Sequence, residues 1–128
     1  MKKVKKRVLI LCVLMLIASI IFPVSAMAAN SFSTTVGFSR QFDGQTRHFT
    51  GHNLGISGAF TANPTTGRFT VEPRTGVVFG GQGSRELNRS GWAVERWLNV
   101  GAGNYFFRFN KAVDGVWVSS NSVLLSSW

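Results

Sequence analysis

Only two histidines, His48 and His52, are available in this chain for acid–base or metal chemistry. Their four-residue spacing would place both on one face of a helix, as a metal-binding pair requires. Gly51 and the alternating pattern around it argue against a helix in this segment. On a strand the two side chains would lie about 13 Å apart, which is too far for one ion. The sequence therefore predicts no metal site and no cofactor.

Serine is abundant, but its contexts differ from those of a catalytic nucleophile. The segment GISG at 55–58 lacks the last part of a G-x-S-x-G elbow and its strand-to-helix setting. A catalytic triad also needs a histidine held by a carboxylate, and Asp43 is the only acid near either histidine in sequence. The segment GGQGS at 80–84 lacks the Lys-Ser/Thr ending of a phosphate-binding loop. We predict no catalytic residues and a protein that is not an enzyme.

The main candidate for binding is an aromatic and arginine-bearing set of residues in the C-terminal third. All four tryptophans and the only tyrosine lie after residue 91. If the chain from there onward forms three strands joined by consecutive hairpins, directly opposed side chains share a face. One face then carries Trp97, Phe106, Arg108 and Trp117. Such a face could stack on sugar rings or rest in a membrane interface, because these aromatics join an apolar body to a polar edge.

The predicted faces depend on the register of those two hairpins. We take Asp114-Gly115 as a two-residue turn and GAGN at 101–104 as a four-residue loop, which places Trp97 opposite Arg108. The guanidinium can then lie over the indole. The opposite face is predicted to be the core: Trp92, Val94, Leu98, Val100, Tyr105, Phe107, Phe109, Val113, Val116, Val118 and Leu124. Arg96 and Lys111 also fall on that core face, so a bulge near either residue would exchange parts of the two faces. The alternative is that the aromatic face is covered by a loop or by another subunit, or that the sheet is simply aromatic on both sides.

The rest of the chain also reads as short strands separated by glycine-containing turns. All 14 glycines lie beyond residue 28, and no segment has a sustained 3.6-residue apolar period. Apolar or alternating runs occur in SFSTTVGFS, TRHFTG, LGISGAFTA, RFTVEP, VVFGG, GWAVERWLNV, NYFFRFNKAV and GVWVSSNSVLLSSW. Asp43-Gly44 predicts a tight turn between the first two runs, and NPTTG predicts a hairpin between the next two. The polar stretch QGSRELNRS predicts a loop or one helical turn. Seven or eight short strands favour an all-β fold, a small antiparallel β-sandwich or barrel.

Residues 1–28 have the pattern of a secretory signal peptide. Five basic residues come first, an apolar run from Val8 to Phe22 follows, and small residues come last. The run is about 15 residues long, whereas a membrane-spanning helix needs roughly 20. Ala26 and Ala28 fit the A-x-A cleavage pattern, with cleavage after Ala26 or Ala29 as alternatives. We predict a mature chain of one all-β domain at 29–128, with a retained membrane anchor as the alternative.

Charge and cysteine content limit the classes of partner. The full chain has a formal charge of +9, but nine basic and five acidic residues remain beyond residue 28, which leaves +4. That charge without a basic run is too small for a nucleic-acid-binding footprint. Cys12, the only cysteine, lies in the apolar run, so the mature chain is predicted to lack disulfides and thiolate sites.

These observations predict a secreted, non-enzymatic binding protein, extracellular or associated with the cell surface. Its aromatic and arginine-bearing face would bind a cell-envelope glycan or an anionic polymer. The alternative is a secreted cationic antimicrobial or bacteriocin-like toxin acting at membranes, as export, small size and tryptophan content suggest. A second alternative is an extracellular structural or matrix protein that associates through sheet edges. The sequence predicts no particular oligomeric state.

Overall fold

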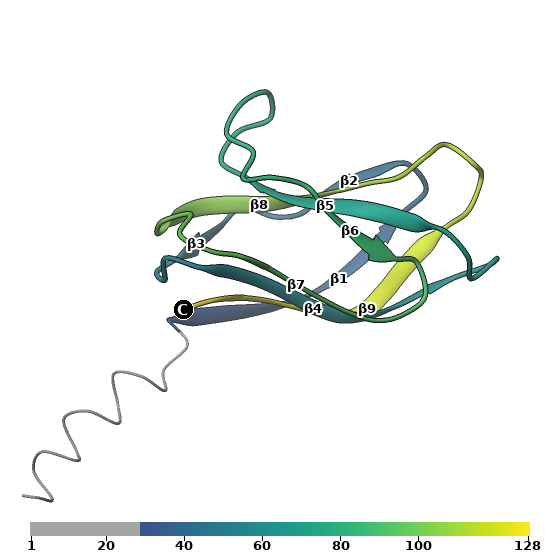
Figure 1. Ribbon diagram of the computed structural model, residues 1–128, viewed down its shortest axis with the longest axis horizontal. Coiled ribbons are helices and arrows are strands. Elements are labelled where there is room, and N and C mark those ends of the chain that lie inside the picture. The colour runs from purple at the N-terminus through teal and green to yellow at the C-terminus, as the bar shows by residue number, and fades with distance from the viewer. Residues whose placement is uncertain (1–28) are drawn as a thin grey trace, which may run out of the picture.

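Two antiparallel β-sheets pack face to face in the part of the chain that the structure, a computed structural model, describes, residues 29–128 (Figure 1). The predicted signal peptide at 1–28 lies outside the described residues. The strands are β1 (Asn30–Phe38), β2 (Gln41–Asp43), β3 (Arg47–Phe49), β4 (Leu54–Ala62), β5 (Arg68–Arg74), β6 (Arg85–Asn88), β7 (Gly91–Trp97), β8 (Gly103–Asn110) and β9 (Val118–Ser127). From residue 29 onward, no helix is long and apolar enough to cross a membrane. The predicted all-β sandwich is confirmed.

Apart from β2 with β3 and β5 with β6, strands that follow each other in sequence lie in different sheets. One sheet has the order β1-β9-β4-β7, and the other has the order β2-β8-β5-β6 with β3 also paired to β8. Strands β2 and β3 follow each other along the same edge of β8. The predicted tight turn at Asp43-Gly44 is therefore wrong: Gly44 lies in a short break between two strands, where its N–H donates to the Phe107 carbonyl at 3.0 Å.

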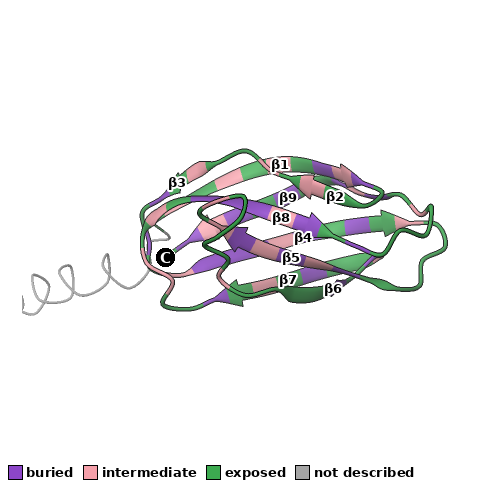
Figure 2. Cartoon of the chain, turned by 90° about the horizontal axis from the view of Figure 1, so that it is seen from above, coloured by how far each residue is buried: buried purple, intermediate pink, exposed green. Residues whose placement is uncertain are grey.

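The core lies between the sheets and is largely aromatic. Phe109 of β8 lies 5.8 Å from Phe38 of β1 and 6.2 Å from Phe69 of β5, measured between ring centroids. Phe107 packs edge-on against Trp97 at 5.8 Å. These separations are typical of stabilising aromatic pairs. Figure 2 shows buried and exposed residues alternating along the strands that enclose this core.

The predicted hairpins of the C-terminal third are wrong. Strand β8 belongs to one sheet, whereas β7 and β9 belong to the other, where both pair with β4. Likewise, β4 and β5 do not form the hairpin predicted from NPTTG, because they lie in different sheets. The segment QGSRELNRS contains strand β6 rather than only a loop. Turn residues marked where strands end but did not show that the chain crosses between the sheets.

This error inverts the predicted faces of β7. Trp92, Val94 and Leu98, which we assigned to the core, are 71%, 49% and 64% exposed. Ala93 and Trp97 are buried instead, at 7% and 1% exposed. The register of β7 is fixed by β4, and a shift by one residue moves every side chain of a strand to the opposite face.

Other parts of the predicted core have mixed outcomes. Tyr105, Phe107, Phe109 and Val118 are confirmed as core residues, and Val100 packs against the core while partly exposed. Val113 and Leu124 are exposed, and Val116 is half-buried. The chain from Lys111 to Trp117 is a connection between the sheets rather than part of two paired strands.

Candidate functional site

Trp97 does not belong to an exposed binding face, so its predicted place there is wrong. Its side chain lies in the core, and its indole N–H donates to the Gly83 carbonyl at 2.7 Å. Its predicted partner Arg108 is in the other sheet, where Asp43 and Glu72 are its neighbours across the strands. Trp97 therefore acts as a packing residue that ties β7 to the segment before β6.

Phe106 and Arg108 both lie on the outward side of β8, as predicted, but they do not form an open surface. Phe106 is only 7% exposed, and the Arg108 guanidinium carbon lies 5.8 Å from its ring centroid. Arg108 donates to both carboxylate oxygens of Asp43, at 2.8 and 3.0 Å, and to the Val77 carbonyl at 3.1 Å. The predicted alternative, coverage of this face by a loop, describes this region better. Three of the five N–H donors of Arg108 are already used within the protein.

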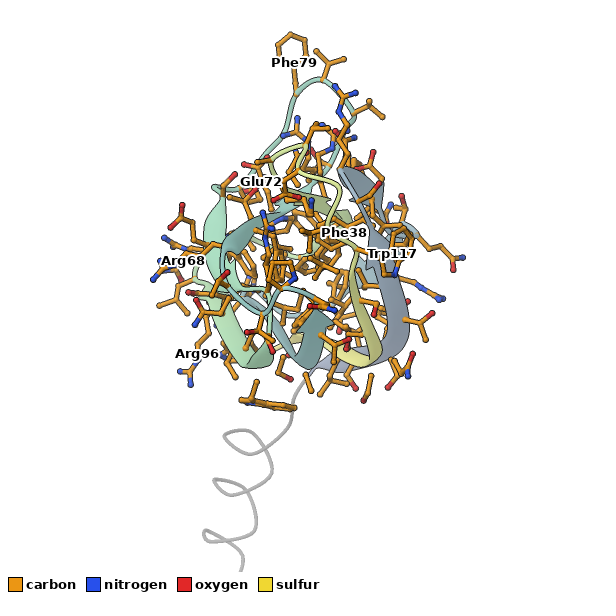
Figure 3. The ribbon with its side chains drawn as sticks, turned by 90° about the vertical axis from the view of Figure 1, so that its right-hand side faces the viewer. Phe38, Arg68, Glu72, Phe79, Arg96 and Trp117 are labelled. Carbon is orange, nitrogen blue, oxygen red and sulfur yellow. The ribbon has the colours of Figure 1, made fainter. Side chains whose placement is uncertain are left out.

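Trp117 is the predicted site residue that remains open to solvent, with 58% of its surface exposed. It follows the connection between β8 and β9 and lies over Gly37 of β1. A Cβ atom added to Gly37 would lie 2.6 Å from Cζ2 of the indole. The glycine thus allows the ring to rest directly on the strand backbone. In Figure 3, Trp117 lies on the outside of the sandwich whereas Phe38 points into its interior.

A shallow groove of about 470 Å³ opens beside this indole. Its other walls come from the end of β4, the connection before Trp117 and the start of β9, and its lining residues are Thr61, Ala62, Asn63, Gly115, Trp117 and Ser119. The Thr61 and Ser119 hydroxyl oxygens are 3.2 Å apart and hydrogen-bonded to each other. The groove therefore combines one aromatic surface with hydroxyl and amide groups that can donate and accept hydrogen bonds.

A second shallow groove of about 400 Å³ lies over β1 and β9. It is lined by Ser33, Thr34, Thr35, Asn121 and Ser122. In the ladder between these strands, the Val36–Ser120 pair lies between this groove and Ser119 of the Trp117 groove. Small polar side chains thus continue along the sheet from the indole.

A charge cluster of two buried cations and one exposed carboxylate holds the connection that carries Trp117. The Asp114 carboxylate accepts from Lys111 Nζ and from Arg89 Nη1, both at 2.6 Å. The side chains of these two cations are 0% and 7% exposed. Lys111 also donates to the Ser39 carbonyl at 2.7 Å, which ties the connection to the end of β1. Hydrogen bonds from Lys111, then from Arg89 and the Val116 N–H, hold the pKa of Asp114 far below its ordinary value.

Sequence reasoning found Trp117 but missed the residues that make it a site. Gly37 is 80 positions away, and Thr61 and Ser119 lie on strands whose pairing was not predicted. One signal was present: Lys111 fell on an apolar face in the predicted register, and it is indeed buried. A buried lysine requires an anionic partner, and Asp114 is the nearest acid in sequence.

The histidines are not brought together. The Nδ1 atom of His48 is 2.9 Å from the Asn104 side-chain oxygen, and His52 lies in the turn before β4. Within residues 29–128, no three His, Cys, Asp or Glu side chains are placed to hold a metal ion.

No family model matches the sequence, and no curated protein does either. Among solved structures, the chain is similar to the C-terminal CBM6 of the marine laminarinase LamC from Zobellia galactanivorans, with a TM-score of 0.50 and 15% identity over 77% of this chain and 100% of that chain. It is also similar to the CBM36-1 domain of a multidomain xylanase from the hindgut metagenome of Trinervitermes trinervoides, with a TM-score of 0.42 and 15% identity over 80% and 73% of the chains. A family two carbohydrate esterase from Cellvibrio japonicus matches with a TM-score of 0.39 and 7% identity, over 77% of this chain and 35% of its own. The likeness to the LamC module shows a shared β-sandwich fold.

Proposed function

We propose that this chain is a non-catalytic glycan-binding protein whose site is the groove beside Trp117. The observation that carries the proposal is the half-open indole, held on Gly37 and bordered by the hydroxyl groups of Thr61 and Ser119 and the amide of Asn63. A sugar ring has an apolar C–H face and a hydroxyl edge. In the groove, the indole matches the apolar face of the sugar, and the hydroxyl and amide groups match its hydroxyl edge.

Two physical properties support this site: its surface is complementary to a sugar, and its side chains are already ordered before a sugar binds. The face of an aromatic ring carries partial negative charge and attracts the slightly positive C–H groups of a sugar. The indole is already packed on the β1 backbone, and the Asp114 cluster fixes its connection. A pre-organised site loses less conformational entropy when it binds, so more of the contact energy appears as affinity.

The shape of the surface favours a chain of sugars over a single one. The second groove continues from the first along β1 and β9, so neighbouring residues of a polysaccharide could lie over both. Every residue that lines these two grooves is uncharged. Of the two ligand classes expected from the sequence, a neutral glycan therefore fits this site better than an anionic polymer.

The fold and the N-terminal segment support the same proposal. The solved structure whose fold this chain shares is described as a CBM, a carbohydrate-binding module. The predicted signal peptide would deliver the protein outside the cell, where envelope and matrix polysaccharides are found. We place the protein outside the cell or at its surface.

The test is a binding screen of residues 29–128 against neutral and anionic polysaccharides, by affinity electrophoresis and then by calorimetry on the glycans that bind. Trp117→Ala should weaken binding about 30-fold or more, because truncating an anchoring tryptophan typically costs at least about 2 kcal/mol. Trp92→Ala is the matched control, because Trp92 is 71% exposed and lines neither groove. Equal affinity of the Trp117→Ala variant and the unchanged chain would contradict the proposal.

A further inference from the structure

The connection between β5 and β6 projects from the sandwich and ends in three exposed apolar side chains. Val77, Val78 and Phe79 are 68%, 74% and 85% exposed. Figure 1 shows the loop rising away from the sheet, and Figure 3 shows Phe79 at its tip with Glu72 near its base. Trp117 lies apart from this tip, on the side of the sandwich. Adjacent exposed apolar residues of this kind indicate an interaction surface.

The loop is built on a closed stem. Thr75 donates its backbone N–H to the Gly80 carbonyl at 3.1 Å, and Gln82 Nε2 donates to the same carbonyl at 3.0 Å. Glu72 is ion-paired with Arg74 and also accepts the Gly83 N–H at 3.1 Å. The tip is therefore held in one conformation by hydrogen bonds and an ion pair below it.

Arginine side chains bind the backbone carbonyls of the tip from beneath. Arg74 donates to the carbonyls of Gly76 and Val78, each at 3.1 Å. Arg108 donates to the Val77 carbonyl, also at 3.1 Å. Moving a carbonyl group into an apolar medium without a hydrogen bond costs free energy. These three carbonyls keep protein partners when water is removed, which lowers the free-energy cost of moving the tip out of water.

We propose that residues 76–80 insert into the interfacial region of a lipid bilayer and anchor the protein there. This inference is independent of the glycan site. A specific protein partner typically buries about 800 Å² on each side, which is more than three side chains on a narrow convex tip provide. The sheet surface around the stem carries the ion-paired Glu72, Arg74, Asp43 and Arg108. A fluid bilayer accepts an isolated apolar tip without a complementary shape.

The charge of the chain indicates which lipids are favoured. Residues 29–128 have a formal charge of +4, and Arg85, at the start of β6 next to the loop, is exposed. A small apolar anchor alone gives weak, reversible attachment, and a second, electrostatic contribution strengthens it. We therefore expect stronger binding to bilayers that contain anionic lipids.

The test is co-sedimentation of residues 29–128, which contain all the strands and core residues that the structure describes, with vesicles of phosphatidylcholine alone or mixed with phosphatidylglycerol. The triple variant Val77→Ser, Val78→Ser, Phe79→Ser should partition at least about tenfold more weakly. The matched control is Val94→Ser, Leu98→Ser, Leu124→Ser, which removes three exposed apolar side chains from the other sheet and its edge. Control binding should equal that of the unchanged chain, and both variants are compared by thermal unfolding.

A second measurement reports on insertion itself. Cys12 is the only cysteine of the chain, so Phe79→Cys in residues 29–128 provides a unique position for an environment-sensitive dye. Vesicles should shift the dye emission to the blue, and lipids that carry a quencher should quench it. Three results would overturn the proposal: vesicles that do not bind the unchanged chain, a triple variant that binds as well as the control, or a dye that remains in water.

Discussion

The connection that carries Trp117 and the loop that carries Phe79 are supported in the same way but present different surfaces. In each, buried or half-buried cations bind backbone carbonyls and pair with one carboxylate. Near Trp117 the cations are Lys111 and Arg89, and the carboxylate is Asp114. Below Phe79 the cation is Arg74, and the carboxylate is Glu72. Trp117 rests on the sheet with hydroxyl groups beside it. Phe79 is 85% exposed at the end of a loop whose neighbouring side chains are two valines.

This difference shows that the surroundings of an exposed aromatic side chain, rather than its exposure, indicate its partner. Hydrogen-bonding groups beside a fixed ring suit a ligand with both apolar and hydroxyl surfaces. An isolated apolar tip with its carbonyls bound from below suits an apolar medium. The two surfaces should therefore respond independently to substitution.

The largest effect is expected from Asp114→Asn. The substitution leaves the buried Lys111 and Arg89 side chains without a negative partner, which is strongly destabilising in a site of this kind. Thermal unfolding should show the greatest loss of stability among the single variants considered, and calorimetry should show weaker glycan binding. Vesicle binding at a temperature where the variant is folded should be unchanged, because the Phe79 loop depends on a separate ion pair.

The matched control for this variant is Glu86→Gln. Glu86 pairs with Arg68, but both side chains are 63% exposed, and an ion pair of that kind contributes about 0 to 1 kcal/mol. A loss of stability as small in Asp114→Asn as in this control would show that the cluster does not hold the connection.

The pH dependence of stability should report on the same cluster around Asp114. The pKa of Asp114 is lowered in the folded protein, chiefly by Lys111 and then by Arg89. A lowered pKa contributes stability above the unfolded-state value of about 3.8, and that stability is lost as the pH falls toward the folded-state value. Urea unfolding between about pH 5 and pH 2 should therefore show a steeper loss for the unchanged chain than for Asp114→Asn. Parallel curves would contradict this role.

Gly37→Ala should cause an intermediate loss of glycan affinity. The added Cβ would lie 2.6 Å from Trp117 Cζ2, so the indole must move away from the strand. We expect about a tenfold loss of glycan affinity by calorimetry with little change in stability, because the ring is displaced rather than removed. Ser31→Ala, an exposed position on the same strand outside both grooves, is the control. Unchanged affinity in Gly37→Ala would mean that the position of the ring is unimportant.

The smallest effect is expected from Thr61→Val. This change keeps the side-chain shape but removes the hydroxyl at the edge of the groove. One hydrogen bond contributes about 0.5 to 1.5 kcal/mol, so the affinity for a glycan should fall about two- to tenfold. The variant should partition into vesicles like the unchanged chain. A loss of vesicle binding would show that the two surfaces are coupled.

The fold class was predictable because alternation and turn residues are local signals. The runs that became β1, β4, β5 and β8 were recognised from their own residues, and the inward set Tyr105, Phe107 and Phe109 followed from alternation alone. The pairing of strands was not predictable in this way. Nothing local in GWAVERWLNV shows that its partner is β4, and the assumption of consecutive hairpins placed Trp92 inside and Trp97 outside.

The candidate site was only partly predictable, because it too depends on the pairing of strands that are distant in sequence. Trp117 stood out by residue type, but its platform Gly37 and its neighbour Thr61 are distant in sequence and meet it only through the pairing of β9 with β1 and β4. The apolar run VVFGG read as one more strand-like segment. It projects instead, and the Arg74 and Arg108 side chains bind its carbonyls where a neighbouring strand would otherwise do so.

The most direct test of the glycan site is an NMR titration of ¹⁵N-labelled residues 29–128 with a glycan that binds in the screen. The indole N–H of Trp117 and the backbone amides of Thr61, Asn63 and Ser119 should show the largest shift changes. The amides of residues 76–80 should not move. Shift changes centred on residues 76–80, or on Trp92 and its neighbours in β7, would contradict the account.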